Sequence, residues 1–87
     1  MLIDVIGVTA LGGTKVYLKF ADGKEGTVDL TEIIKFNGVF APLKDESYLR
    51  QVAINAELGT IYWPNNADIC ADVLYAKVRL SQLSWRW

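Results

Sequence analysis

The fold of this chain is decided by residues 12–30, which read GGTKVYLKFADGKEGTVDL. Gly12-Gly13 and Asp22-Gly23 are hairpin turn signals, because glycine readily adopts the positive φ angles that tight turns need. Between the two turns, apolar and polar side chains alternate with the period of a strand. This pattern predicts three successive antiparallel strands. The middle strand is expected to point three side chains into the core: Val16, Leu18 and Phe20.

The flanking segments complete the expected order of elements. Residues 2–11 are almost continuously apolar, which is typical of a central strand covered on both faces. After residue 30 we expect a short helix ended by Asn37-Gly38, an apolar connector, and a second short helix capped by Asp45. Two short strands joined at Gly59, a loop, and a last helix from about Ala71 complete the chain.

The order β-β-β-α-α-β-β-α places the chain in the α+β class. We expect residues 1–87 to form a single domain, with a small mixed, mostly antiparallel sheet and short helices packed on one side of it. A chain of 87 residues, of which 52% are hydrophobic, can bury one modest core.

The charges are balanced, with nine Lys and Arg against ten Asp and Glu and a net charge of −1. Nucleic-acid binders usually carry a basic excess, so direct nucleic-acid binding is not expected. The single cysteine, Cys70, excludes an internal disulfide and is expected to be a buried structural thiol. The N-terminus does not resemble a signal peptide, and no apolar run is long enough to span a membrane. We therefore expect a cytoplasmic protein without membrane contact.

Catalytic machinery is not visible in the sequence. The chain has no histidine, which excludes Ser-His-Asp and Cys-His nucleophile activation and the usual zinc sites. The sequence also lacks the glycine-rich motifs that bind phosphate. Asp68 and Asp72 stand four residues apart near the start of the last helix, where helix capping explains them more simply than a metal site. We therefore expect no enzymatic activity, no cofactor and no metal.

Three motifs occur in order along the chain: FADG and VDL within residues 20–30, GVFAPL at residues 38–43 with Asp45 behind it, and LGT, WPN, Asp68 and VLY within residues 58–75. In this order and spacing, the chain resembles a family of short bacterial proteins known only as domain-of-unknown-function family 2442. The resemblance covers residues 3–75 and leaves residues 76–87 as a C-terminal extension.

Two positions depart from the pattern of that family. Asn66 stands where the family commonly has glycine after Trp-Pro-Asn, and asparagine is the other residue that best tolerates positive φ. Ala71 stands where a helix-starting proline is common, and alanine fits a first helical turn equally well. We therefore expect both departures to preserve the fold.

What the resemblance implies about function is limited, because the activity of the family is undefined. Its members resemble small companion proteins, and some lie beside a second short gene in an arrangement similar to a toxin–antitoxin pair. Some longer members carry a helix-turn-helix domain after this module, and such a domain is not expected within these 87 residues. The resemblance thus implies a companion role rather than a defined reaction.

The loop at residues 63–68 is the first candidate functional region, and two interpretations of it remain open. In the structural one, the loop is a tight turn in which Trp63 covers the core and Asp68 accepts hydrogen bonds from loop amides. In the functional one, exposed Trp and Asn side chains anchor a partner. The candidate contact residues are Trp63, Pro64, Asn65, Asn66 and Asp68.

The C-terminal tail is the second candidate region. If the last helix continues, five residues share one stripe at three- and four-residue spacing: Val73, Ala76, Leu80, Leu83 and Trp87. The stripe packs either on the chain's own sheet or on another subunit or partner, and both interpretations remain open. We predict self-association through the segment after Tyr75, because leaving this stripe and Trp85 in water would create an apolar patch.

The leading hypothesis is a non-enzymatic protein-interaction module, an antitoxin-like or regulatory companion that binds a small protein partner or a second copy of itself. A second hypothesis is a nucleic-acid-associated regulator that uses a small basic face formed by Lys15, Lys19 and Lys24. A third is a small-ligand binder or carboxylate-based enzyme, which would need a concave pocket with converging acids. The tyrosines available to such a site are Tyr17, Tyr48, Tyr62 and Tyr75.

Overall fold

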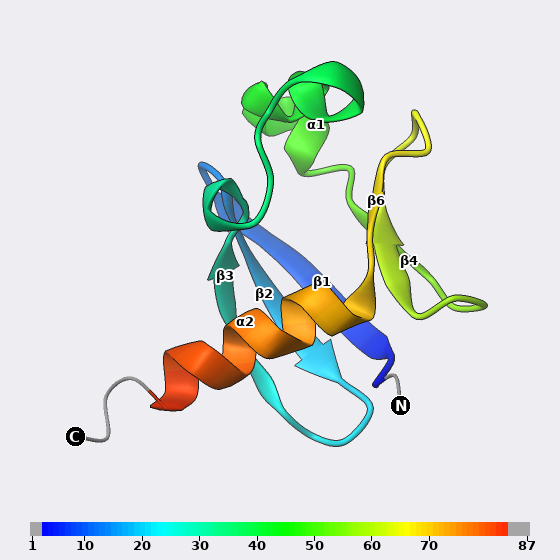
Figure 1. The fold of residues 1–87 in the computed structure, drawn as a ribbon. Coiled ribbons are helices and arrows are strands. Elements are labelled where there is room, and N and C mark those ends of the chain that lie inside the picture. The colour runs from blue at the N-terminus through cyan, green and yellow to red at the C-terminus, as the bar shows by residue number, and fades with distance from the viewer. Residues whose placement is uncertain (1–2, 84–87) are drawn as a thin grey trace.

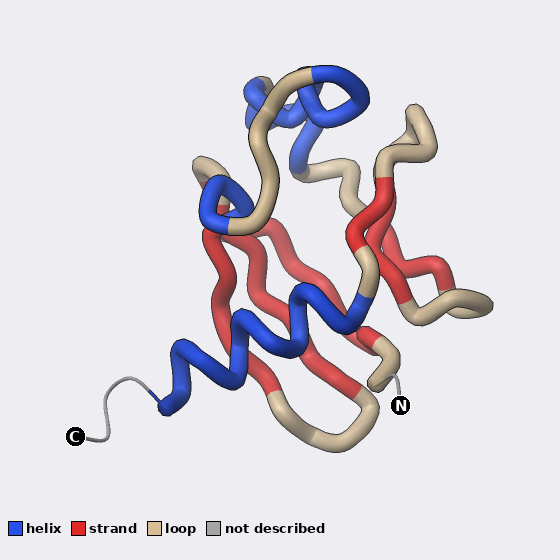
Figure 2. The backbone as a smooth tube through the Cα atoms, viewed as in Figure 1, coloured by secondary structure: helices blue, strands red, loops and turns tan. Residues whose placement is uncertain are grey.

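The computed structural model describes residues 3–83, with side chains described up to residue 79. Within these residues, the α+β class is confirmed, and the strands form two three-stranded antiparallel sheets (Figures 1 and 2). The first sheet contains β1 (Val5–Gly12), β2 (Lys15–Phe20) and β3 (Glu25–Asp29), and the second contains β4 (Ala53–Asn55), β5 (Thr60–Tyr62) and β6 (Asp68–Ile69). The helical segments are the 3-10 helices η1 (Leu30–Glu32) and η2 (Gly38–Lys44) and the α-helices α1 (Glu46–Leu49) and α2 (Ala71–Leu83).

The first sheet is the predicted succession of hairpins, in the order β1-β2-β3. β2 pairs antiparallel with both neighbours, so Val16 lies between Ala10 on β1 and Val28 on β3. Gly12 and Gly13 turn the first hairpin with φ angles of 112° and 59°. As predicted, the core face of β2 is fully buried, through Val16, Leu18 and Phe20.

β1 is an edge strand, so the prediction of a central strand for this segment is wrong. Its pairing with β2 shifts register between Val5 and Gly7 and again between Ala10 and Gly12, which marks two bulges. The extra residues at the bulges, Ile6 and Leu11, have exposed side chains. The apolar run therefore belongs to a bulged edge strand and not to a strand buried on two faces.

Of the two helices predicted after β3, the second is present as α1, capped by Asp45, whereas the first differs from the prediction. η1 ends at Glu32, whereas the sequence predicts a helix that continues up to Asn37-Gly38. Asn37 and Gly38 begin η2 where they were expected to end a helix, and η2 occupies the predicted connector. Pro42 lies inside η2 and has no N–H to donate, so a regular ladder of α-helical hydrogen bonds cannot form there.

Two aspartate side chains cap helical segments, and one of them is the predicted cap at Asp45. The side chain of Asp29 accepts a hydrogen bond from the backbone N–H of Thr31 at 3.0 Å and so caps η1. Asp45 accepts from the backbone N–H of Ser47 at 2.9 Å and caps α1. Each bond satisfies a donor that the first helical turn would otherwise leave without a partner.

Residues 53–69 form a second sheet, in the order β4-β5-β6, instead of joining the first one. β4 and β5 pair on either side of the predicted turn at Gly59, whereas β6 has two residues and is too short to leave a periodic signal in the sequence. The N–H of Val5 donates to the carbonyl of Gly59 at 3.0 Å and connects the two sheets. Gly59 has a φ of 70°, and a Cβ there would collide with the Asp4 carboxylate.

α2 begins at Ala71 as predicted and crosses one face of the first sheet (Figure 1). Up to residue 79, where its side chains are described, its buried residues are Ala71, Leu74 and Val78. Val78 packs on β3 at Gly26, where an added Cβ would lie 3.1 Å from a Val78 methyl carbon. Among the described residues, the largest fully buried side chain is that of Trp63, from the loop after β5. None of the helices in this part of the chain has the length and hydrophobicity needed to span a bilayer.

Candidate functional site

Trp63 is fully buried, so the loop at residues 63–68 does not present it to a partner. Its indole N–H donates to the carbonyl of Leu49, at the end of α1, with a separation of 3.0 Å. This bond satisfies a buried donor and connects the second sheet to α1. The interpretation of Trp63 as an exposed interface anchor is therefore corrected, because the side chain belongs to the core.

Asn65 holds the loop against two neighbouring segments. Its backbone N–H donates to the Tyr48 hydroxyl at 3.0 Å, and its side-chain Nδ2 donates to the carbonyl of Val39 in η2 at 2.9 Å. Its Oδ1 accepts from the N–H of Ala67 at 3.1 Å, which closes an Asx turn. Asn65 thus accepts the loop hydrogen bond that was predicted for Asp68, while Asp68 itself lies in β6.

Asn66 adopts the left-handed conformation, with a φ of 69°. Its N–H donates to the carbonyl of Trp63, and the N–H of Trp63 donates to the carbonyl of Ala67, both at 2.9 Å. The prediction that asparagine preserves this turn in place of glycine is confirmed. The residues of the loop that face solvent are Pro64, Asn65, Asn66 and Asp68.

A second long-range contact connects the turn after β2 to α2. The hydroxyl of Tyr75 donates to Oδ2 of Asp22 at 2.6 Å, and the Tyr75 ring packs edge-on against Phe20 with centroids 5.1 Å apart. The hydrogen bond is the main cause of a lowered pKa for Asp22 and a raised pKa for Tyr75. Two of the four tyrosines considered for a ligand site, Tyr48 and Tyr75, therefore connect separate segments of the fold.

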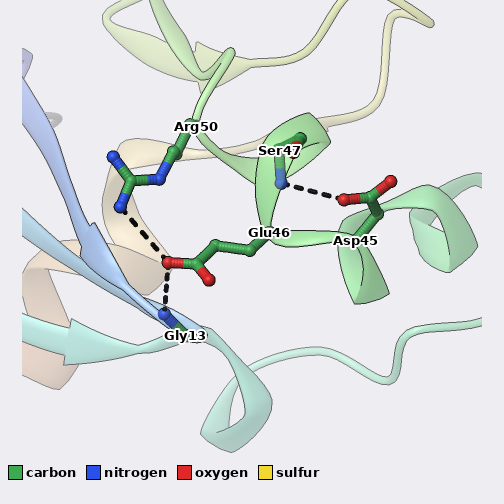
Figure 3. Close-up of polar contacts among 5 residues, drawn as sticks. All are labelled: Gly13, Asp45, Glu46, Ser47 and Arg50. Atoms are coloured by element: carbon green, nitrogen blue, oxygen red, sulfur yellow. Dashed lines mark hydrogen bonds and ion pairs between the residues drawn. The ribbon is translucent and has the colours of Figure 1, made fainter.

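A third contact lies at the tip of the first hairpin (Figure 3). One carboxylate oxygen of Glu46 accepts from the backbone N–H of Gly13 at 3.2 Å and lies 3.3 Å from Nη2 of Arg50. The ion pair is exposed and so contributes little to stability by itself. Its structural effect is to hold α1 beside the turn between β1 and β2.

The lysines of the hypothetical basic face are interleaved with acids. On the outer side of the first sheet, Lys15 pairs across strands with Asp29, and Lys19 pairs with Glu25. The hydrogen bond from Thr31 is the main cause of a lowered pKa for Asp29, and the charge of Lys15 adds to it. Neighbouring opposite charges offset the positive potential that would attract a phosphate backbone.

The other chemically reactive side chains do not converge. Asp68 lies in β6 and Asp72 in the first turn of α2, so the two carboxylates do not share a helix face. Cys70 is exposed between buried Ile69 and buried Ala71, so the prediction of a buried thiol is wrong. In the part of the chain that the structure describes, no three Cys, Asp or Glu side chains are grouped as metal ligands.

α2 carries apolar residues on the face that points away from the core. Val73 is 45% exposed and Ala76 is exposed, whereas Leu74 and Val78 are buried. The described members of the predicted stripe therefore face solvent and do not pack on the chain's own sheet. The other candidate residues of this region lie outside the residues or side chains that the structure describes: Leu80, Leu83, Trp85 and Trp87.

The model of a family described as "Protein of unknown function (DUF2442)" matches residues 5–79. The chain belongs to this family. No curated protein and no solved structure matches the chain. The DUF2442 match spans both sheets and most of α2, so it includes the regions in which the contacts of Asn65 and Tyr75 lie.

The three motifs of this DUF2442 chain meet in space. Asp22 of the first motif bonds to Tyr75 at the end of the third, 53 residues later in the chain. Asn65 of the third motif bonds to the carbonyl of Val39 in the second, at a separation of 26 residues. In their described contacts, these motif residues connect distant segments of the fold.

Proposed function

We propose that this chain is a non-enzymatic protein-interaction module, an antitoxin-like or regulatory companion that binds its partner through the outer face of α2. The observation that carries the proposal is that Val73 and Ala76 face solvent, while Leu74 and Val78 on the opposite side fill the core. Apolar residues on both sides of one helix exceed what one small core can bury, and exposed apolar groups on a helix are typical of contact surfaces.

Two observations favour this function over the alternatives. The lysines on the outer side of the first sheet stand beside Asp29 and Glu25, which weakens the case for a phosphate-binding surface. Asp68 and Asp72 lie on different elements, and Tyr75 is engaged with Asp22, which weakens the case for a carboxylate-based site. An apolar helix face needs neither a charge excess nor converging acids.

The test is affinity purification of the tagged full chain from its native host, followed by mass spectrometry. The wild-type chain is compared with the double variant Val73→Glu/Ala76→Glu and with Lys44→Glu, which changes the net charge equally but lies in η2. We expect the wild type and Lys44→Glu to retain a stoichiometric protein, either a companion or an untagged copy of the chain, and the double variant to lose it. Recovery of the same proteins by all three chains, or of none by the wild type, would overturn the proposal.

A further inference from the structure

We propose that the outer face of α2 binds the same face of a second copy of this chain, in a two-fold symmetric pair. The inference rests on the proposed function, because it names the partner for that surface. Four exposed residues of α2 form the proposed contact surface: Asp72, Val73, Ala76 and Arg79.

The four residues form a patch with the geometry of a helix-crossing site. Asp72 and Ala76 are four residues apart, and Val73, Ala76 and Arg79 follow at three-residue steps, so two surface rows intersect at Ala76. The small side chain at the intersection allows two helix axes to approach closely, with the longer side chains packing on either side of it. Val73 supplies the apolar contact next to this centre.

The charges at the two ends of the patch are complementary under two-fold symmetry. Asp72 lies in the first turn of α2, and Arg79 lies two turns further along on the same side of the helix. In an antiparallel pair centred near Ala76, each Asp72 lies close to the partner's Arg79. A parallel pair would instead place like charges together. The patch is therefore self-complementary, which is the requirement for an isologous dimer.

The chain's own sheet ends before the helix does. Val78 already packs on Gly26 of β3, and β3 is the edge of the first sheet. The following turn of α2 extends past that edge (Figure 1). Lys77 is held by Glu32 at 3.1 Å, so its charge stays with its own chain and does not compete for the partner's Asp72. The outer face at Ala76 points away from the first sheet, so a second copy of α2 can cover it without displacing the packing of Val78 on Gly26.

The experiment measures the association of the full chain by sedimentation equilibrium. We expect the wild type to dimerise at micromolar concentrations and Arg79→Asp to raise the dissociation constant by about tenfold or more, because two attractive contacts become repulsive. The charge-exchanged variant Asp72→Arg/Arg79→Asp should restore most of the affinity, since each helix again presents opposite charges. Lys44→Glu is the control and should behave as the wild type.

The outcomes separate this inference from the proposed function. A wild-type monomer, or a dimer that Arg79→Asp leaves unchanged, would overturn the inference. If that monomer still retains a companion protein that Val73→Glu/Ala76→Glu loses, the proposed function stands without the dimer. Asp72→Arg alone removes an acid from the first helical turn and can weaken α2 itself. Far-UV circular dichroism of each variant therefore accompanies the measurement, and Arg79→Asp, which leaves that turn intact, decides the result.

Discussion

The sequence offers both the loop at residues 63–68 and the apolar stripe of the last helix as candidate contact surfaces, yet the two are built in opposite ways. The loop directs Trp63 into the core and uses the side chain of Asn65 to bond both η2 and its own turn. α2 directs Leu74 and Val78 inward and leaves Val73 and Ala76 in solvent. A motif rich in aromatic and amide side chains can therefore be engaged within its own chain, while apolar residues of a helix stay exposed to solvent.

Replacing Trp63 with alanine should cause the largest loss of stability, and it tests whether the loop packs this side chain into the core. Loss of a fully buried tryptophan costs about 3–5 kcal/mol of unfolding free energy, and the carbonyl of Leu49 loses its donor as well. For a domain of this size, such a loss approaches the whole stability. Urea unfolding followed by circular dichroism measures the change. An alanine variant with nearly wild-type stability would contradict the buried placement of Trp63.

The two faces of α2 allow a matched pair of substitutions. Leu74→Ala should lower the unfolding free energy by about 2–4 kcal/mol, because Leu74 is fully buried. Val73→Ala, one residue earlier on the exposed face, should change it by less than about 0.5 kcal/mol. Both are measured by urea unfolding at protein concentrations low enough to avoid association. Equal losses of unfolding free energy at Leu74 and Val73 would mean that α2 does not bury the face that carries Leu74.

These contrasts show which parts of the molecule are encoded locally. The first sheet could be predicted because Val16, Leu18 and Phe20 alternate with polar residues between two glycine turns. The edge position of β1 could not, because a bulge lets an apolar residue such as Ile6 point outward without breaking the apolar run. Periodicity gives the type of an element, but pairing partners decide its place in the sheet.

The candidate sites depend on contacts between residues far apart in the chain, and these leave no local pattern. Whether Trp63 is a core residue depends on Leu49, and the role of Asn65 depends on Val39 and Tyr48. The sequence does contain one usable signal, an asparagine directly after Trp-Pro, which is typical of an Asx turn. For α2, the spacing placed Val73 and Ala76 on one face, as the structure does, but only the burial of Leu74 and Val78 shows that this face points to solvent.

A smaller loss of stability is expected at Asn65, and it tests whether this side chain attaches the loop to η2. Asn65→Ala removes the side-chain bonds to the carbonyl of Val39 and to the N–H of Ala67, and should cost about 1–2 kcal/mol of unfolding free energy. Asn65→Asp keeps the acceptor for Ala67 and loses the donor to Val39, so its cost should be intermediate. Amide hydrogen exchange should show faster exchange in η2 for both variants. Unchanged exchange there would mean that Asn65 does not hold η2 in place.

The smallest effect on stability is expected from the hydrogen bond between Tyr75 and Asp22. Unlike the other effects, this one depends on pH. The pKa of Asp22 is lowered from 3.8, so its contribution to stability is present above that value and is lost as the pH falls through the lowered pKa. The pKa of Tyr75 is raised from 10.0, so its contribution is present below that value and is lost as the pH rises through the raised pKa. The bond is therefore fully effective between about pH 4 and pH 10.

Tyr75→Phe isolates this bond, because phenylalanine keeps the edge-on packing against Phe20 and loses only the hydroxyl. We expect the variant to unfold at a slightly lower temperature than the wild type throughout the neutral range. The difference between the two melting temperatures should shrink below the ordinary pKa of Asp22 and again above that of Tyr75. Asp22→Asn is the complementary variant and should remove only the acidic limb of the dependence, since it retains an oxygen that can accept from Tyr75. A difference that stays constant from acidic to alkaline pH would mean that the hydroxyl and the carboxylate do not interact, and that α2 is held to the first sheet by apolar packing at Leu74 and Val78.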